Sequence, residues 1–345
     1  MKYLEYDIFN VRSHNYRYQA RDHLHVLNIE EKMMTGPTLE KAITGLYCSV
    51  ELTNVHDELI VLSTLNIFLS ITAFLGNTLI FTALRRKNSL YPPSKLLYRT
   101  LAITDLCVGV VVQPLCVAYL MSVKNERWDI WYNFYVALFV ASYILCAVSL
   151  FILTAISVDR LLALLLGLRY RKVVTLKNVY TTVIVMWALS VVATTSYFWN
   201  PVIFSPLLYT HLSVCISTST FSHMKIFFTL RQYQAEAKKN VFQGEPRQAI
   251  SLPLNIARYR KAVYSALWVQ VTLFVCYLPF CITQVFITHL KSAKFSSSVY
   301  LAKTFSFTLV FLNSSLNPLL YCWKIKEVRQ AVKDTVREIY RSLTS

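Results

Sequence analysis

Residues 178–224 read NVYTTVIVMWALSVVATTSYFWNPVIFSPLLYTHLSVCISTSTFSHM, and no charged side chain occurs at any of these 47 positions. The hydrocarbon core of a bilayer is about 30 Å thick, and a helix of about 20 apolar residues crosses it. The stretch is therefore too long for one crossing and long enough for two. Pro201 and Pro206 predict the turn between the two crossings.

Five further stretches are apolar and free of charge, at lengths suited to one crossing each: residues 59–84, 106–123, 130–158, 262–290 and 304–323. With the pair in 178–224 they predict an all-α membrane protein, a bundle of seven transmembrane helices. The composition agrees, because 55% of the 345 residues are hydrophobic, 15% are charged and the mean hydropathy is +0.43. A soluble domain carries about a quarter charged residues, so an ordinary soluble enzyme is excluded.

Basic residues are concentrated in alternate loops and in the tail. Residues 85–99, 159–177, 225–261 and 324–345 hold 24 of the 35 Lys and Arg residues and only six of the 18 acids. Cytoplasmic loops collect Lys and Arg, so this pattern predicts an extracellular N-terminus and a cytoplasmic C-terminus. Because topology explains the net charge of +17, nucleic acid is not expected as a partner.

The two ends of the chain lie outside the predicted bundle of residues 59–323. Residues 1–58 read as a polar, disordered extracellular leader without the apolar core of a signal peptide, and Met33 and Met34 leave a shorter start open. Residues 324–345 place apolar side chains at helical spacing between Lys and Arg, which predicts an amphipathic helix along the lipids of the inner leaflet. The eight cysteines show no metal-type spacing, so zinc is not expected.

Polar side chains also occur inside the apolar segments, where an ionisable group costs about 2.5 to 3.5 kcal/mol to insert. Asp105 is the clearest case, with Asn77 in the first segment and Asn313 and Asn317 in the last. A carboxylate and amides that converge on a bundle axis either hold a small hydrated cation or water, or only join helices by hydrogen bonds. The residue types alone leave both interpretations open.

Six short motifs follow one another along the predicted helices. They are Gly76-Asn77, Leu101-Ala102-x-x-Asp105, Asp159-Arg160, Trp187, Pro279 and Asn317-Pro318-x-x-Tyr321. In this set and order the chain resembles the rhodopsin-like (class A) G-protein-coupled receptors over about residues 58–341. The resemblance implies a multi-pass plasma-membrane receptor, not an enzyme, that transmits an extracellular ligand signal to a cytoplasmic heterotrimeric G protein.

The resemblance also implies roles for individual residues. Arg160 would contact the G protein in the active state, and Asp159 would restrain Arg160 in the inactive state. Pro279 and Pro318 each remove a backbone hydrogen bond and form a hinge, and Tyr321 would swing inward on activation. An allosteric Na+ is the one cofactor that the resemblance implies. The family's sodium pocket is matched by Asp105, Ser149, Asn313 and Asn317.

Several inner positions depart from the family pattern. The acid that often pairs with the helix-three arginine from the base of helix six is missing, because residues 258–261 read RYRK. Asp159 is then left nearly alone to restrain Arg160, and we expect activity without ligand. Three further positions differ from the residue that the family usually has. Cys215 stands in place of a proline, His223 in place of a tyrosine and Tyr277 in place of a tryptophan.

The outer face departs most. Tyr135 stands where helix three usually carries a disulfide cysteine, and the loop around Asn200-Pro201 is very short. With Cys215, this pattern is nearest to the melanocortin, adenosine, cannabinoid and lysolipid receptors. Ser142 replaces the aspartate of amine receptors and Phe311 the retinal-binding lysine of opsins, which disfavours amines and retinal and leaves a small-molecule, lipid or peptide ligand. The expected pocket residues are Ser142, Tyr143, Cys146, Tyr277, Phe280, Gln284, Lys303 and Phe307.

Two other functions stay open at this point. A receptor-shaped protein that binds a ligand or partner without G-protein signalling is compatible with Tyr277 and Cys215. A seven-helix membrane hydrolase would need His and Asp ligands for zinc inside the membrane. The sequence supplies His211 and His223, about 120° apart around a helix, with no third ligand nearby.

Overall fold

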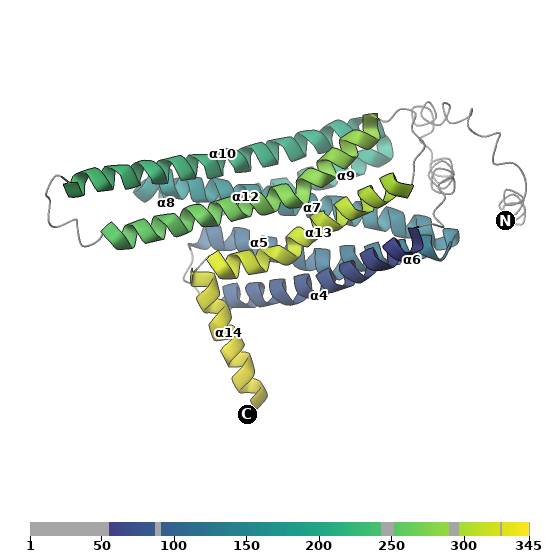
Figure 1. The fold of residues 1–345 in the computed structure, drawn as a ribbon, viewed down its shortest axis with the longest axis horizontal. Coiled ribbons are helices and arrows are strands. Elements are labelled where there is room, and N and C mark those ends of the chain that lie inside the picture. The colour runs from purple at the N-terminus through teal and green to yellow at the C-terminus, as the bar shows by residue number, and fades with distance from the viewer. Residues whose placement is uncertain (1–54, 87–90, 243–251, 290–296, 325, 345) are drawn as a thin grey trace, which may run out of the picture.

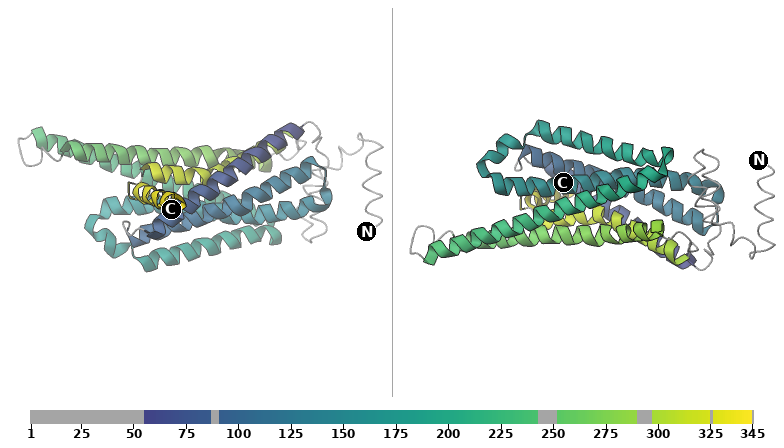
Figure 2. Two further views of the ribbon diagram at one scale, coloured as in Figure 1. Left: turned by 90° about the horizontal axis from the view of Figure 1, so that it is seen from below. Right: turned by 90° about the horizontal axis from the view of Figure 1, so that it is seen from above.

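The computed structural model describes residues 55–86, 91–242, 252–289, 297–324 and 326–344. Within these ranges the chain is almost entirely helical and contains no strand, which confirms the predicted all-α class. The long helices lie side by side in an elongated bundle, as the views of Figure 1 and Figure 2 agree. The expectation of a polar leader falls on residues 1–58, of which 1–54 lie outside the described part of the chain.

The bundle is built from seven consecutive helical segments. They are α4 (His56–Arg86), α5 to α6 (Pro92–Cys107 and Gln113–Lys124), α7 (Trp128–Leu166), α9 (Leu176–Trp199), α10 (Pro201–Phe242), α12 (Leu252–His289) and α13 (Ser297–Lys324). Two short elements, η3 (Gly167–Arg169) and α8 (Tyr170–Val173), join α7 to α9. Gly167 ends α7 with φ at 49°, a backbone conformation that suits glycine.

Five segments in the described ranges are long and apolar enough to cross a membrane: His56–Arg85, Pro92–Lys124, Ile130–Val173, Leu176–Trp199 and Gln270–Ile287. The last lies within α12. The remaining two long helices, α10 and α13, carry more hydroxyl and amide side chains and pack in the same bundle. Several of these polar groups are buried against neighbouring helices, so the bundle itself supplies their hydrogen-bond partners.

The turn between the fourth and fifth crossings is shorter than the sequence predicted. α9 ends at Trp199 and α10 begins at Pro201, so only Asn200 lies between them. Pro206 was expected to mark this turn, but it lies inside α10. A proline in the interior of a helix removes one backbone hydrogen bond, and neighbouring helices and hydroxyl side chains of a membrane bundle can compensate for it, so α10 continues through Pro206.

The second crossing contains a π-helical segment, η2 (Val108–Val112), between α5 and α6. Gly109 in this segment lies against α4, because a Cβ atom there would meet the Cβ of Ala73 at 3.0 Å and the carbonyl oxygen of Ser70 at 3.1 Å. The Ser70 hydroxyl in turn donates to the carbonyl oxygen of Gly109 at 2.6 Å. A π-helical turn often marks a functional position in a helix, and this one begins three residues after Asp105.

The first and last crossings are closely packed at Gly76. A Cβ atom at this position would lie 2.9 Å from both Cβ and Cγ of Pro318. Buried polar contacts join the same two helices: Asn77 Nδ2 donates to the Ser314 carbonyl oxygen at 3.0 Å, and Ser315 Oγ donates to the Leu69 carbonyl oxygen at 2.9 Å. The absence of a side chain at Gly76 therefore sets the distance between α4 and the proline of α13.

Aromatic rings form the outer end of α7. Trp131 is fully buried and stacks on Tyr135, with ring centroids 5.6 Å apart and planes 16° apart. Tyr119 of α6 lies 6.2 Å from both rings, and its hydroxyl accepts a hydrogen bond from Tyr300 of α13 at 3.3 Å. Tyr135 occupies the position at which the receptor family usually has a disulfide cysteine. In this chain the packing of rings joins helices two, three and seven at that place.

After the bundle, α14 (Lys326–Thr344) leaves the end of α13 steeply, as Figure 1 shows, and contacts α4. Val328 of its apolar stripe is 1% exposed, whereas Val336 is 47% exposed. One end of the stripe thus packs on the bundle. The other end remains open to the surroundings, where an amphipathic helix meets lipid headgroups.

Candidate functional site

A polar cluster lies at the centre of the bundle around Asp105 of α5, which is fully buried. One carboxylate oxygen, Oδ1, accepts hydrogen bonds from Ser149 Oγ at 3.1 Å and Ser314 Oγ at 2.8 Å. The other, Oδ2, accepts from Asn317 Nδ2 at 2.7 Å. Helices two, three and seven are therefore joined through one carboxylate.

Asn313 belongs to the same predicted set and is 2% exposed, but its Nδ2 atom has no hydrogen-bond partner. Ser314 takes the place beside Asp105 that the sequence assigned to Asn313. The sequence analysis missed Ser314 because a serine next to an asparagine carries no signal of its own. The Asp105 carboxylate and the hydroxyl oxygens of Ser149 and Ser314 are the kind of ligand that a small cation takes. The unpaired Asn313 Nδ2 is a hydrogen-bond donor, so it suits the oxygen of a water molecule around such an ion and not the ion itself.

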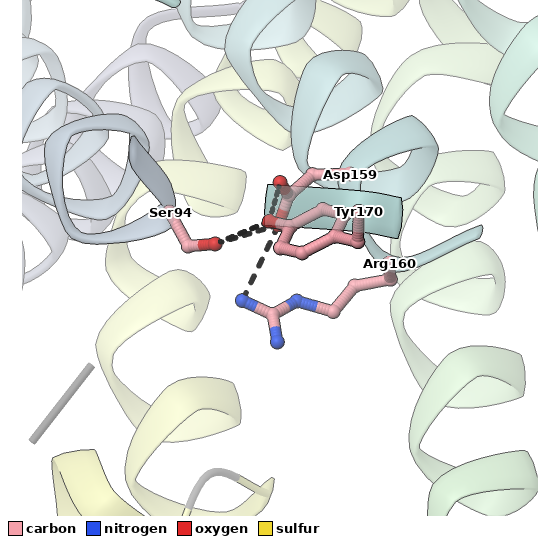
Figure 3. A network of polar contacts seen from close by, with 4 residues as sticks. All are labelled: Ser94, Asp159, Arg160 and Tyr170. Carbon is pink, nitrogen blue, oxygen red and sulfur yellow. Dashed lines mark hydrogen bonds and ion pairs between the residues drawn. The ribbon is translucent and has the colours of Figure 1, made fainter. Parts of the chain in front are cut away.

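The C-terminal part of α7 carries a second polar cluster, drawn in Figure 3. Arg160 Nη2 lies 3.5 Å from Asp159 Oδ2, and the Arg160 side chain is 43% exposed while that of Asp159 is 4% exposed. Tyr170 of α8 donates to Asp159 Oδ1 at 2.6 Å, and Ser94 of α5 donates to Oδ2 at 2.9 Å. The Asp159 carboxylate therefore contacts Arg160, the next residue in the chain, and joins α7 to both α5 and α8.

The arginine is supported on its other side by aromatic rings. Its guanidinium carbon lies 5.5 Å from the ring centroid of Tyr98, and Tyr98 packs edge-to-face on Tyr321 with centroids 5.1 Å apart. Asp159 was expected to restrain Arg160 nearly alone, and the structure adds Tyr98 as a contact. Tyr98, Ser94 and Tyr170 were missed because their residue types are common at membrane boundaries.

The residues predicted to bind a ligand lie at the outer half of the bundle, and some of them touch. Gln284 Nε2 of α12 donates to the Tyr143 hydroxyl of α7 at 3.2 Å. The Tyr143 ring packs against Phe280 and Phe307 with centroids 6.4 and 5.9 Å away. Helices three, six and seven therefore meet around Tyr143.

Two aromatic residues that were not predicted complete this group. Phe204 of α10 lies 5.2 Å from Tyr143 between ring centroids, and the Tyr209 hydroxyl donates to the Gln284 carbonyl oxygen at 3.2 Å. Phe139 of α7, also outside the predicted set, lies 4.6 Å from Tyr143 between ring centroids. A ring on every third or fourth residue of α7 is the signal that could have found Phe139.

The other predicted pocket residues have different surroundings. Ser142 is 3% exposed and its hydroxyl donates to the Phe139 carbonyl oxygen in its own helix. Tyr277 is 3% exposed, while Cys146 and Lys303 are half-buried. A cavity of about 650 Å³ lies elsewhere, between α5 and α9 at the inner end, and is lined by Pro92, Lys95, Leu96, Arg99, Leu176, Lys177 and Tyr180.

The two intramembrane histidines lie in separate environments. His211 packs edge-to-face on Phe151 with ring centroids 4.1 Å apart, and His223 Nε2 lies 3.2 Å from the Ser157 hydroxyl. In the part of the chain that the structure describes, no three His, Cys, Asp or Glu side chains group as a metal site. The geometry does not assemble the ligands that a zinc hydrolase would use.

Comparison with known proteins agrees with this architecture. Residues 76–205 match the family model of the 7 transmembrane receptor (rhodopsin family). The chain is 33% identical to the Dopamine D2-like receptor of Drosophila melanogaster over 172 residues, which is 45% of this chain and 19% of that protein. It is 24% identical to Adenosine receptor A3 of Ovis aries over 296 residues, 77% of this chain and 86% of the receptor.

A further relative, the human 5-hydroxytryptamine receptor 1E, is 24% identical over 177 residues, which is 51% of this chain and 46% of that receptor. The chain thus spans about a fifth of the dopamine receptor and about half of the serotonin receptor. With the helical bundle and its apolar segments, these matches indicate a multi-pass membrane protein. The chain is similar to the rhodopsin-like (class A) G-protein-coupled receptors.

Proposed function

We propose that this receptor transmits an extracellular ligand signal to a heterotrimeric G protein through the inner ends of α7, α10 and α12. The proposal rests on the exposure of Arg160 and on the side chains that it contacts. Its guanidinium is part-exposed at the end of α7 and rests between Asp159 and Tyr98, and Tyr98 also touches Tyr321 of α13. A shift of α13 can therefore reach the arginine through one ring.

The orientation and location follow from the same charge pattern. We place the N-terminus outside and the C-terminus in the cytoplasm of a plasma-membrane receptor, because the basic loops lie on one side. Support for an inner-leaflet role of α14 comes from the exposed half of its apolar stripe. Membrane lipids are then partners of α14 in addition to the bundle.

The ligand is proposed to bind around Tyr143, Gln284 and Phe307. These side chains form a mainly aromatic surface with few polar groups, as small-molecule sites often do. Dopamine and serotonin receptors are among the relatives, but Ser142 holds the position of their aspartate. We therefore favour a small-molecule, lipid or peptide ligand whose binding does not depend on an ammonium group, with Lys303 at the mouth.

Sodium is proposed as an allosteric ion at Asp105. The residues that would hold it are Asp105, Ser149, Ser314 and Asn313, all of them buried oxygen- or amide-bearing groups on helices two, three and seven. A bound monovalent cation would supply a positive charge to a carboxylate inside the membrane. This chain's own residues orient that carboxylate through Asn317, and they set the distance between α5 and α13.

The test compares ligand-free activation of a panel of G-protein sensors by the wild type and Arg160→Ala at equal surface level. Arg85→Ala serves as the matched control, because Arg85 is also an inner-end arginine stacked on a ring, 5.4 Å from Phe81. A signal that Arg160→Ala abolishes and Arg85→Ala preserves supports the proposal. Equal signals from all three would contradict it, and silence from all would favour a receptor-shaped binding protein that does not signal.

A further inference from the structure

A buried polar chain joins helices three, five and six just above the inner end of the bundle. Its members are Ser157 of α7, Ser219, Thr220 and His223 of α10, and Gln270 of α12. Ser219 is fully buried, and Ser157, His223 and Gln270 are each at most 8% exposed. Ser157 precedes Arg160 by three residues, which is about 4.5 Å along a helix axis. The chain therefore lies next to the arginine switch.

The side-chain amide of Gln270 forms hydrogen bonds with α10 through both its oxygen and its nitrogen. Its Oε1 accepts a hydrogen bond from Ser219 Oγ at 3.1 Å, and its Nε2 donates to Thr220 Oγ1 at 2.9 Å. The Thr220 hydroxyl in turn donates a hydrogen bond to the Ile216 carbonyl oxygen at 2.7 Å. Because the two partners are consecutive residues of α10, the amide fixes both the height and the rotation of α12 against α10.

Ser157 of α7 lies against the same group. Each hydroxyl has one hydrogen to donate; that of Ser219 goes to Gln270, and that of Ser157 goes to the Leu153 carbonyl oxygen at 3.0 Å in its own helix. The Ser157 oxygen lies 3.2 Å from both Ser219 Oγ and His223 Nε2. A hydrogen on His223 Nε2 would let α10 donate to this oxygen, so α7 meets α10 beside the contact between Ser219 and Gln270.

We propose that Gln270 is a positioning residue that clamps α12 to α10, next to Ser157 of α7, in the closed receptor. This inference rests on the proposed function, since it concerns how the same switch is restrained. The base of helix six carries the basic run RYRK at residues 258–261, where a charged restraint would need an acid. A neutral clamp placed higher in α12, inside the membrane, supplies the restraint without any charge.

The Gln270 amide has few alternative hydrogen-bond partners if α12 moves away. Inside a bilayer a polar group released from its partner finds no water, although neighbouring backbone can take part of its place. Outward movement of α12 alone breaks both bonds of Gln270 and leaves an amide facing lipid. Two such interhelical bonds correspond to an increase of about sevenfold in the open-to-closed ratio when they are lost.

The experiment uses Gln270→Met, which keeps the length of the side chain and removes both bonds. Thr272→Val is the matched control, because Thr272 lies two residues further along α12 and its hydroxyl bonds only within its own helix, to the Trp268 carbonyl oxygen at 2.9 Å. Ligand-free activation is measured in cells at equal surface level. We expect a rise of about sevenfold for Gln270→Met and none for Thr272→Val.

The second measurement does not depend on signalling. Backbone hydrogen exchange is followed in the purified, G-protein-free receptor over the peptide 262–276 of α12. Gln270→Met should exchange faster than the wild type and Thr272→Val. If no variant signals but exchange still rises, the clamp stands and the signalling function fails. Exchange equal to the wild type in Gln270→Met overturns the clamp whatever the signalling assay shows.

A double substitution tests the partner. Ser219→Ala removes one of the two bonds and should raise basal activation by about threefold. In the double variant Ser219→Ala/Gln270→Met the effect should equal that of Gln270→Met alone, because both changes remove the same contact. Fully multiplicative effects would show that Ser219 and Gln270 act separately, and they would contradict the clamp.

Discussion

The guanidinium of Arg160 lies over the ring of Tyr98, with 5.5 Å between the guanidinium carbon and the ring centroid. The same ring packs edge-to-face on Tyr321 of the last helix. One tyrosine therefore connects the arginine of helix three with the tyrosine of the Asn317-Pro318-x-x-Tyr321 motif. Because both contacts use the same ring, a movement of Tyr98 changes both.

Tyr98→Leu should raise ligand-free signalling. The cation–π contact contributes about 0.5 to 1 kcal/mol at a part-exposed site, so its loss predicts an increase of about two- to fivefold. G-protein sensors in cells at equal surface level measure it. Phe81→Leu is the control, because Phe81 lies under Arg85 and Arg99 at the same end of the bundle. A rise of equal size in the control would refute a specific role of Tyr98.

Asp159→Asn should raise ligand-free signalling more than Tyr170→Phe does. The aspartate substitution removes the charge that holds Arg160 and weakens the bonds from Ser94 and Tyr170, whereas Tyr170→Phe removes one bond of 2.6 Å. Tyr170→Phe should chiefly lower thermal stability, by about 1.5 to 3 kcal/mol for a hydrogen bond to a charged group. Sensors and melting of the purified receptor separate the effects. The reverse order of signalling would be inconsistent with Asp159 as the restraint.

Gly76→Ala should destabilise the receptor without changing its polar clusters. The added Cβ would lie 2.9 Å from two carbon atoms of the Pro318 ring, and overpacking of this kind costs about 1 to 3 kcal/mol. The measurement is the melting temperature of the purified protein in detergent. Leu75→Ala, at an exposed neighbouring position, should melt close to the wild type. An unchanged melting temperature for Gly76→Ala would mean that α4 and α13 separate freely.

Sodium should stabilise the wild type but not Asp105→Asn. Replacing KCl by NaCl at equal ionic strength is expected to raise the melting temperature of the wild type, because a ligand that binds only the folded state stabilises it. The asparagine keeps hydrogen-bonding capacity and loses the charge that would attract the ion. Equal melting in both salts for the wild type would remove sodium from the proposal, while leaving the hydrogen bonds of Asp105 in place.

Trp131→Ala should weaken the outer end of the bundle. Trp131 is fully buried between Tyr119 and Tyr135, and truncating a buried tryptophan costs about 3 to 5 kcal/mol. Reduced surface expression and a lower melting temperature are expected, and Ile130→Ala at an exposed position is the comparison. If Trp131→Ala melts like Ile130→Ala, ring packing does not hold helices two, three and seven together here.

The helical bundle could be predicted from the sequence because lipid imposes a simple rule, in which charge-free stretches of about 20 residues become helices. The central carboxylate was also recognisable, since Asp105 is costly in an apolar segment. Ser314 and Ser94 were not, because serine is common in membrane helices and their partners lie 209 and 65 residues away in the sequence. Whether the predicted ligand residues bind a ligand stays a prediction.

Pro206 and Gln270 show two further limits of the sequence. A proline usually indicates a turn, yet α10 continues through Pro206, because a helix in a membrane bundle tolerates the loss of one backbone hydrogen bond. Gln270 belongs to no motif in the predicted segment 262–290, and its importance depends on Ser219 and Thr220 facing it from another helix. Rotation of one helix against another is set by side-chain packing, which spacing along one segment does not reveal.

The π-helical segment Val108–Val112 divides the second crossing into two halves with independent orientation. Each residue turns a regular helix by about 100°, so the additional residue held in this segment rotates everything beyond it relative to Asp105. Deleting one residue here would restore regular winding and leave the inner carboxylate in place, but Tyr119 would point away from Trp131 and Tyr300. The segment therefore changes the angular position of all the residues that follow it around the helix axis. The direction of a side chain in one half of this helix cannot be derived from residue spacing in the other half.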